Sequence, residues 1–493
     1  VAEHIQSQRY RTIHNIENWH NAALAAVGFC LDDAELANLA IDAEFGFHRQ
    51  LAAGVRNDGL WWEGSSSYHF YALWPLVLLA QICAPVGRDL WRHPRLEQMF
   101  RAPLALVLPD LRLPATNDCW LFSSLLADLC HGVPPAASFY EIAHAWYDDP
   151  AFAWPLGRNY RQRERDSLEA LLWGRSEIGE EDESFSSAGV DCTPSGLAML
   201  RSFDPLERQS CLLLKYGPHG GGHGHPDKLA VSIYAGGEPV CPDLGTPGYG
   251  IELNQTWYRQ TLSHNTIVVD GHSHPPAEGV SMTFARDAGG FGVVDAKVDF
   301  DGDPYRGVSI RRTILWAEGY CVDVVLVHCD RERQIDWTFR SAGELVQATG
   351  LAAVAVPRLE GAGYEHVAAP RAWRAGGPAS LHWRLERTAF GLHLPDEGAS
   401  TIIRGKVPGN PAAETSDLVI RRRRTAETVY LAVLELAPGA ATTVASRPCQ
   451  DSRCWEIEVT GRDRTEHWLV CPPDTTATGA EADVQVNRYS MRD

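Results

Sequence analysis

The spacing of apolar residues changes once along this chain, close to residue 175. Before that point apolar residues recur every three to four positions, as in residues 21–31 and 71–82, which is the period of an amphipathic helix. Segments rich in Gly, Pro, Asn and Asp separate these runs at intervals that suit helical hairpins. The pattern predicts a helical domain over residues 1–174 and includes the apolar run 120–130 among its helices.

Beyond residue 196 the apolar runs become short, β-branched and aromatic, and Gly, Pro and Asp bound them. Such runs without intervening helices predict large antiparallel sheets, arranged as a β-sandwich region over residues 197–493 with room for a small C-terminal β subdomain. The acidic, Ser- and Gly-rich segment 175–196 separates the two patterns and is expected to be a linker. The fold class is therefore α+β with several domains.

The charge and composition of the chain exclude some classes of binding partner. The chain has 493 residues and a net charge of −19, and its Lys and Arg residues are scattered, which argues against a nucleic-acid partner. No run approaches about 18 consecutive apolar residues, so no membrane partner is expected. The first residues lack the layout of a signal peptide, and the compartment stays open between periplasm or exterior and cytoplasm. Twelve cysteines without a CxxC pair favour reduced core residues such as Cys83 and Cys211, and thus lean toward a reducing compartment.

A glycine- and histidine-rich stretch, "GPHGGGHGHPDKLAVSIY" at residues 217–234, is the first candidate for chemistry. Glycine permits close backbone approach, and histidine supplies metal ligands or titratable groups. His223 and His225 are two residues apart, so an extended segment projects both to one face. A hairpin that turns at Gly236 and Gly237 brings Asp243 toward the same end as His225.

A third candidate ligand, His264, precedes the next predicted strand. Two histidines and one carboxylate are a reasonable set for zinc with one open position. His274 in "GHSHPP" competes for the third place, and spacing alone does not decide between the two.

The helical domain holds a second candidate constellation in "DGLWWEGSSSYHFYALWPL", residues 58–76. The serine run at 65–67 predicts a helix entry, after which Tyr68 and His69 lie in the first turn. Asn15 and Asn18 lie in the first turns of another apolar helix, where asparagine usually acts as a cap.

These stretches, together with "TWYRQTLSHNTIVVDG" at residues 256–271, resemble the heparinase II/III-type polysaccharide lyases. That superfamily includes heparin and heparan sulfate lyases as well as alginate and oligoalginate lyases. The resemblance implies an incomplete (α/α) toroid followed by antiparallel β-sandwich domains. Members usually carry more helical sequence upstream than this chain shows.

The resemblance also implies an activity, the β-elimination of a uronic acid-containing glycan that leaves a C4=C5 unsaturated uronate. Tyr68 matches the general acid, and His223 matches the histidine that acts as base or stabilises the carboxylate. Asn15 is the candidate for neutralising the C5 carboxylate, and Asn18 is the alternative, because many relatives have Asn-His where this chain has Asn15-Ile16.

The metal ligands of zinc-binding members map to His225, Asp243 and His264. The expected cofactor is one divalent metal, with zinc as first choice, which fixes the Gly-rich loop rather than entering the chemistry. Substrate contacts are expected from Glu63, His69, Tyr258 and Arg259, with Asn18 beside them.

Two other functions are weighed against the lyase. A carbohydrate-binding protein of the same fold would not need an acid and a base together, and a zinc-dependent hydrolase is disfavoured by the lack of an HExxH helix. The expected partner is an anionic poly- or oligosaccharide of uronate units. Because Arg and Lys residues are spread along the chain apart from the run at residues 421–424, uronate-rich or lightly sulfated chains rank ahead of heparin. The sequence leaves open the oligomeric state, the C5 epimer and endolytic or exolytic action.

Overall fold

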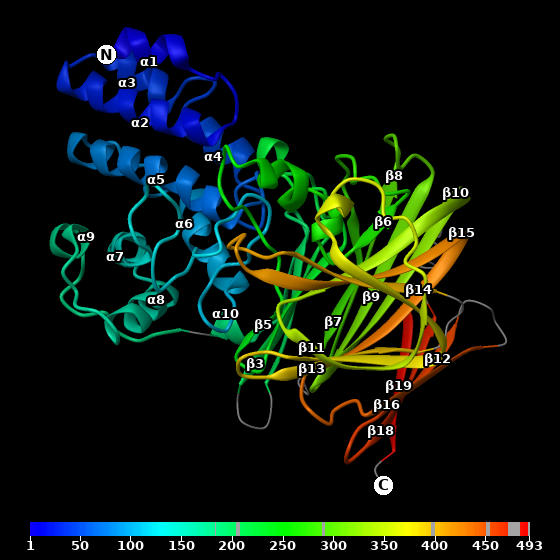
Figure 1. Ribbon diagram of the computed structural model, residues 1–493. Coiled ribbons are helices and arrows are strands. Elements are labelled where there is room, and N and C mark those ends of the chain that lie inside the picture. Colours follow the sequence, from blue (N-terminus) through cyan, green and yellow to red (C-terminus); the bar gives the residue numbers. More distant parts are fainter. Residues whose placement is uncertain are drawn as a thin grey trace. The chain divides into compact units, whose positions relative to one another are not determined.

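Helices and strands segregate along the chain (Figure 1). The computed structural model describes residues 1–182, 184–203, 208–287, 291–395, 400–449, 454–471 and 484–491. Two units divide them: unit 1 comprises residues 1–188 and 220–224, and unit 2 comprises residues 189–219 and 225–493. The Gly-rich stretch is thus shared, with His223 in unit 1 and His225 in unit 2.

Unit 1 is helical. Its α-helices are α1 (Ala2–Gln8), α2 (Asn15–Cys30), α3 (Ala34–Ile41), α4 (Phe47–Gly54), α5 (Ser66–Cys83), α6 (Pro94–Arg101), α7 (Ala136–Tyr147), α8 (Pro150–Tyr160), α9 (Leu168–Leu172) and α10 (Ser184–Ser187), and its 3₁₀ helices are η1 (Ala84–Val86), η2 (Ala102–Leu106) and η3 (Gly221–His223). One apolar core joins residues of α2 through α8.

Helix α5 positions the candidate site, and its sequence explains its place. Ser65 caps the helix by accepting a hydrogen bond from the Tyr68 backbone N–H at 3.4 Å, as the serine run predicts. The helix is apolar on all sides because it is buried on most of them. By length and composition alone Ser66–Val86 would qualify as a membrane span, and 56% of its apolar 18-residue window is buried inside the protein.

The prediction of a helix over residues 120–130 is wrong. The segment is irregular because side-chain hydroxyls take the backbone groups that a helix would use. Ser67 Oγ accepts from the Trp120 backbone N–H at 3.0 Å, and Ser123 Oγ donates to the Leu129 carbonyl at 2.6 Å. The apolar period arises instead from inward-facing side chains of a folded loop, as with the buried Leu125 and Leu129.

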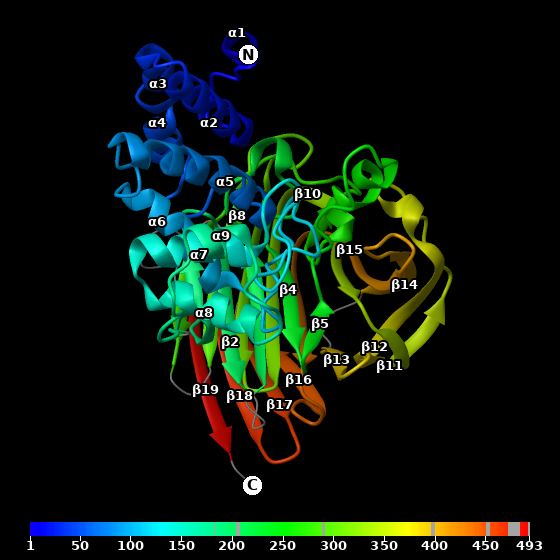
Figure 2. The ribbon, with the colours of Figure 1, turned by 90° about the vertical axis from the view of Figure 1, so that its left-hand side faces the viewer.

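Unit 2 consists of three antiparallel sheets (Figure 2). The five-stranded sheet contains β1 (Val190–Cys192), β2 (Leu197–Phe203), β3 (Gln209–Lys215), β4 (Ala230–Ala235) and β5 (Glu238–Cys241). The ten-stranded sheet contains β6 (Ile267–Val269), β7 (Val280–Arg286), β8 (Gly292–Phe300), β9 (Val308–Ala317), β10 (Tyr320–Ser341), β11 (Glu344–Val354), β12 (Ala368–Arg384), β13 (Ala389–Leu394), β14 (Thr401–Pro408) and β15 (Thr415–Glu435). The four-stranded sheet contains β16 (Thr443–Pro448), β17 (Trp455–Thr460), β18 (Thr465–Cys471) and β19 (Gln485–Met491). Short helical turns η4 (Asn254–Tyr258), η5 (Thr261–Ser263) and η6 (Tyr364–His366) lie between strands.

The ten-stranded sheet is the middle layer of unit 2. One of its faces shares an apolar core with β2 to β5. Its other face, around Tyr320 and Val433, packs against β16 to β18 through residues such as Trp455 and Trp468. The alternation of inward and outward side chains along each strand thus produces face-to-face sheet packing.

The segment between the two patterns contains structure of its own. Within residues 175–196, predicted as a linker, lie helix α10 and strand β1, which pairs with β2. Cys83 and Cys211 are buried free thiols, in agreement with their prediction as core residues. Cys454 and Cys471 form a disulfide that the sequence did not indicate.

Candidate active site and candidate metal centre

The candidate acid and base of unit 1 lie against each other. Tyr68 occupies the first turn of α5, and the ring of His223 stacks on it with centroids 3.5 Å apart and planes 20° apart. The side chain of His223 is 18% exposed, so the pair is accessible without being fully solvated. The two residues that the resemblance paired are therefore brought together.

A buried carboxylate fixes the imidazole of His223. Asp118 Oδ2 lies 3.0 Å from His223 Nδ1, and the Asp118 backbone N–H donates to the His223 carbonyl at 3.2 Å. The side chain of Asp118 is fully buried. A carboxylate at Nδ1 favours the tautomer with the proton on that nitrogen and leaves the lone pair on Nε2.

Glycine is required where residues 220–224 approach the helical part of unit 1. A Cβ on Gly220 would lie 2.0 Å from the Glu63 carbonyl oxygen, and one on Gly221 would lie 2.8 Å from the Trp62 ring. Gly221 also has a φ of +61°, in the left-handed region. The glycines therefore serve close backbone approach, and this approach delivers His223 to Tyr68.

Asn15 belongs to a buried polar network that includes Glu63. Asn15 Nδ2 donates to the two Glu63 carboxylate oxygens at 3.0 and 2.8 Å, and Trp61 Nε1 donates to one of them at 2.8 Å. His14 caps α2 beside Asn15 and interacts electrostatically with Glu63 and His223. Burial, as the largest effect, lowers the pKa of His14. The network holds Asn15 in one orientation.

Asn18 and His69 have structural partners instead of exposed polar groups. Asn18 Nδ2 donates to the Ala72 carbonyl at 3.4 Å. His69 Nδ1 accepts from the Trp61 N–H at 3.1 Å, and its Nε2 lies 2.8 Å from the Met99 carbonyl. Burial lowers the pKa of His69 to about 4, so the ring is neutral. The structure therefore gives His69 a role in fixing the loop before α5, in place of the predicted substrate contact.

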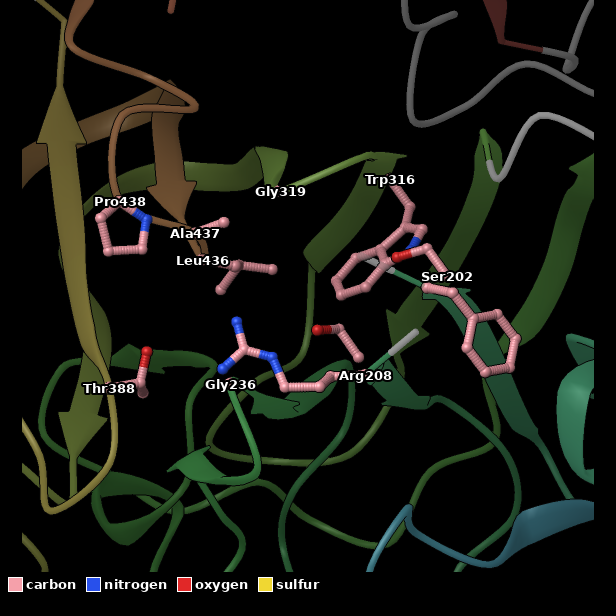
Figure 3. A pocket seen from close by; sticks show the side chains of 11 residues that line it. Ser202, Arg208, Gly236, Trp316, Gly319, Thr388, Leu436, Ala437 and Pro438 are labelled. Carbon is pink, nitrogen blue, oxygen red and sulfur yellow. The ribbon is translucent and has the colours of Figure 1, made fainter. Parts of the chain in front are cut away.

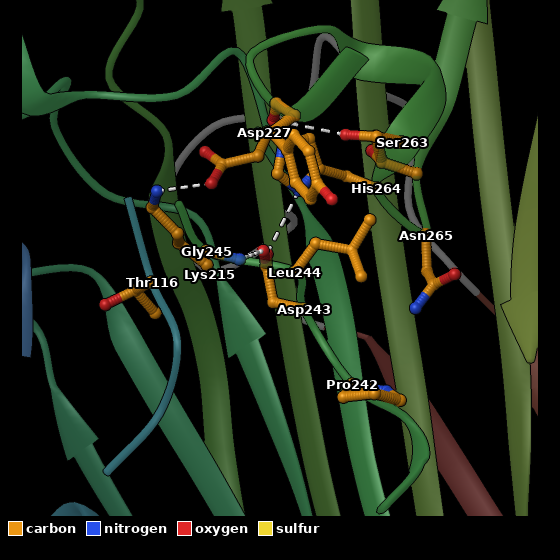
Figure 4. A network of polar contacts seen from close by, with 12 residues as sticks. Thr116, Lys215, Asp227, Pro242, Asp243, Leu244, Gly245, Ser263, His264 and Asn265 are labelled. Carbon is orange, nitrogen blue, oxygen red and sulfur yellow. Dashed lines mark hydrogen bonds and ion pairs between the residues drawn. The ribbon is translucent and has the colours of Figure 1, made fainter. Parts of the chain in front are cut away.

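Unit 2 brings His225 and His264 together with a carboxylate. Figure 4 shows His264 beside Asp227 and Asp243. One potential ligand atom each from His225, Asp227 and His264 lies within 4.8 Å of the other two, and all three residues are buried. Among the described residues, Asp227 Oδ1 and His264 Nε2 have no hydrogen-bond partner. Buried polar atoms without partners are costly, and a metal ion would satisfy both.

The predicted ligand Asp243 lies beside this cluster. Its Oδ2 is 3.0 Å from His264 Nδ1. Burial would raise the pKa of Asp243, but the His264 and His225 rings outweigh it and hold the pKa well below its ordinary value. For Asp227 burial is likewise the largest effect and is opposed mainly by the ion pair with Lys215, which lowers the pKa. Both carboxylates are thus ionised, the state that a metal ligand requires.

The competing ligand His274 and the predicted contact Tyr258 are structural. His274 Nδ1 accepts from the Lys228 N–H at 3.2 Å, and its Nε2 lies 2.8 Å from the Ile267 carbonyl. Tyr258 is fully buried and donates its hydroxyl proton to the Gly409 carbonyl. Burial raises its pKa to about 12. Arg259 is half-buried and interacts with His219, and its predicted substrate contact stays a prediction.

Asp118, Asp227 and His14 are residues that sequence reasoning missed. Asp118 ends the polar group "TND" in an otherwise apolar stretch, which is a weak signal. Asp227 follows the Gly-His repeat after one proline, and its carboxylate two residues from His225 is a signal visible in the sequence. His14 precedes Asn15 and could have been grouped with it.

A separate pocket of unit 2 is unsuited to acid–base chemistry (Figure 3). The residues that line it include neither an acid nor a histidine. They are Ser202, Phe203, Arg208, Ser210, Gly236, Trp316, Gly319, Thr388, Leu436, Ala437 and Pro438.

Comparison with known proteins identifies relatives for both units. Residues 187–425 match the family "Heparinase II/III-like, C-terminal", and residues 1–111 match the family "Alginate lyase". Heparinase III shares the fold, with a TM-score of 0.66 at 12% identity over 99% of this chain and 69% of that chain. The predicted resemblance to the heparinase II/III-type polysaccharide lyases is confirmed.

Two curated relatives carry more specific names. An alginate lyase of Stenotrophomonas maltophilia (strain K279a) is 28% identical over 430 residues, which cover 78% of this chain and 56% of that protein. An exo-oligoalginate lyase of Saccharophagus degradans is 24% identical over 288 residues, which cover 54% of this chain and 38% of that protein. The chain therefore spans about half the length of these relatives or less.

Proposed function

We propose that this protein is a polysaccharide lyase that cleaves a uronic acid-containing glycan by β-elimination. The observation that carries the proposal is the stacked pair of Tyr68 and His223 with Asp118 at Nδ1 of the imidazole. An acid and an oriented base at one place serve proton transfer, which binding alone does not need. The matched families and the curated lyases support the same reaction.

The proposed reaction removes one proton from the substrate and donates one proton to the leaving group. Nε2 of His223 removes the proton at C5 of the uronate, and the electron pair of that C–H bond forms the C4=C5 double bond. The bond from C4 to the glycosidic oxygen breaks, and the Tyr68 hydroxyl donates its proton to this oxygen. The products are an unsaturated uronate and a chain with a new hydroxyl end.

The C5 proton is acidic enough to remove only when the neighbouring carboxylate is stabilised. Asn15 is the proposed donor to that carboxylate, because an amide N–H stabilises the enolate-like charge that develops on it. Glu63 holds the amide of Asn15 in place. His14 lies in the same electrostatic network and is the second group suited to this task.

The finer architecture and the cofactor belong to the proposal. The helices of unit 1 are proposed to form an incomplete (α/α) toroid. Unit 2 is proposed to hold one zinc ion through His225, His264 and either Asp227 or Asp243, a set of nitrogen and oxygen donors that zinc accepts. Bound there, zinc would neutralise the buried carboxylates and fix the segment that follows residue 224.

The proposed substrate is an unsulfated uronate chain of the alginate type. The curated relatives are named alginate lyase and exo-oligoalginate lyase. The arginine run 421–424 is engaged within the protein: Arg421 is buried, and Arg422 and Arg424 form ion pairs with Asp336 and Glu332.

The test is ultraviolet absorbance of the C4=C5 bond during incubation with alginate blocks, hyaluronan, chondroitin sulfate, heparan sulfate and heparin. We expect a rise on alginate that is lost in Tyr68→Phe and kept in Tyr71→Phe, which removes a hydroxyl one helical turn later on α5. New reducing ends without absorbance would replace the lyase by a hydrolase. Binding without any product would replace it by a carbohydrate-binding protein.

A further inference from the structure

Unit 1 carries an aromatic platform that the reaction above does not use. It consists of Trp120, Phe122 and His131, which lie on the irregular segment between η2 and α7. The rings of Trp120 and Phe122 are nearly parallel, with centroids 5.7 Å apart and planes 20° apart. His131 meets both rings edge-on, at 4.7 Å from Trp120 and 4.9 Å from Phe122.

The platform is exposed although its segment is held firmly. Phe122 is 39% exposed, and exposing a large apolar ring to water is unfavourable unless a partner covers it. Hydrogen bonds fix the backbone beneath it: Ser67 Oγ accepts from Trp120 N–H, and Ser67 Oγ and Ser123 Oγ are 2.7 Å apart. The exposure of Phe122 is therefore a property of an ordered surface.

The same anchors hold the catalytic groups. Ser67 directly precedes Tyr68, and Asp118, which orients His223, lies two residues before Trp120. A ligand on the platform is thereby fixed in position relative to the acid and the base of unit 1. Both matched families leave residues 112–186 uncovered, so the platform belongs to the part of the chain that they do not describe.

We propose that Trp120, Phe122 and His131 form a sugar-stacking subsite for a pyranose ring of the uronate chain. This inference rests on the proposed lyase function and adds a residue-level binding site to it. Aromatic faces carry partial negative charge, so they attract the C–H groups of a pyranose face and not its carboxylate. The subsite therefore contacts the face of the sugar ring and leaves the carboxylate in water.

The subsite has a kinetic consequence. A sugar bound on the platform contributes binding energy only when the chain is long enough to reach the platform from the cleaved bond. Short oligouronates thus lack this contribution, and the preference for longer chains depends on Phe122 and Trp120.

The test compares Phe122→Ala with a matched control, Trp146→Ala. Trp146 is 40% exposed and stacks on Trp91 at 4.7 Å, so it offers the same kind of surface on α7 of the same unit. We expect Phe122→Ala to raise KM for long oligouronates about tenfold with kcat within about twofold, and to leave the shortest cleavable substrate unchanged. Phe122→Tyr, which keeps the ring, is expected to restore KM.

Binding measured without turnover separates this inference from the lyase itself. Isothermal titration of saturated oligomannuronate and oligoguluronate is performed on Tyr68→Phe with and without Phe122→Ala. Weaker binding in the double variant supports the subsite even when the wild type releases no unsaturated product, the result that would refute the lyase. Equal KM and equal binding with and without Phe122, or an equal loss in Trp146→Ala, overturns the subsite. Absence of all binding by the wild type overturns both.

Discussion

Two histidines that stand two residues apart in the sequence end in different environments. His223 belongs to unit 1, is 18% exposed, stacks on Tyr68 and has a carboxylate at Nδ1. His225 belongs to unit 2 and is fully buried with Asp227 and His264. The first environment suits a group that exchanges protons with a ligand, and the second suits a group that holds a metal ion.

The carboxylates near the two histidines also differ between unit 1 and unit 2. Asp118 contacts Nδ1 of the His223 imidazole, the contact expected of a residue that orients the proposed base. In unit 2 two ionised carboxylates lie near two histidines, and Lys215 forms an ion pair with one of them, Asp227. Histidines and aspartates therefore suit different functions in the two units, because the units differ in how deeply these side chains are buried and in which groups they contact.

The largest effect is expected from His223→Ala. Without the base, turnover of the preferred uronate should fall by about 10³-fold, within the range known for general acid–base groups. The content of the proposed zinc ion and the melting temperature should stay at the wild-type values, because His223 lies outside the candidate metal cluster. Product formation by absorbance and metal analysis of the same preparation check this. Loss of the metal in His223→Ala would contradict the assignment of proton transfer to His223 and of metal binding to His225.

A smaller loss is expected from Asp118→Asn. The variant keeps the size of the side chain but presents an amide to His223 Nδ1, so the imidazole loses its preferred tautomer. We expect kcat to fall about 10²-fold with KM nearly unchanged. Asp118→Glu, which retains a carboxylate, should recover part of kcat. A change in KM alone would assign Asp118 to substrate binding instead.

Removing the proposed metal ligand His225 should affect stability first. We expect His225→Ala to lose the proposed zinc ion and to lower the melting temperature by about 5 °C, because an ion bound only to the folded state stabilises it. His274→Gln is the matched control, since His274 already has backbone partners at both nitrogens. Zinc retained by His225→Ala would contradict the assignment of the cluster.

The smallest effect concerns pH and His69. The pKa of this buried ring is lowered to about 4 from 6.5, so the unfolded chain binds its proton first as pH falls. Its contribution is fully present above pH 6.5 and declines as pH falls toward 4, by at most about 3 kcal/mol. His69→Gln should therefore lose stability at pH 7 and approach the wild type near pH 4. Denaturant unfolding across this range measures the difference, and a constant gap would refute it.

The sequence predicted local features better than long-range ones. The hairpin of β4 and β5 turns at Gly236 and Gly237 as predicted, and Ser65 starts α5, because turn and cap chemistry is local. Asp118 was missed because it lies 105 residues from His223. The run 120–130 has a helical period, yet hydroxyl groups of Ser67 and Ser123 override it.

The carboxylate ligand of the candidate metal centre shows a further limit of prediction from the sequence. The hairpin register correctly suggested that Asp243 lies near His225, but the segment before β4 also brings in Asp227. Irregular backbone has no period, so its side-chain directions follow from contacts that only the structure shows.

Residues 220–224 return to the helical unit after the chain has already formed three strands of unit 2. A gene fragment that ends at codon 188 would encode all ten α-helices of the described residues and no His223. The complementary fragment would carry His223 on a loop without its acid. Cutting the chain at this point therefore separates the proposed acid, Tyr68, from the proposed base, His223.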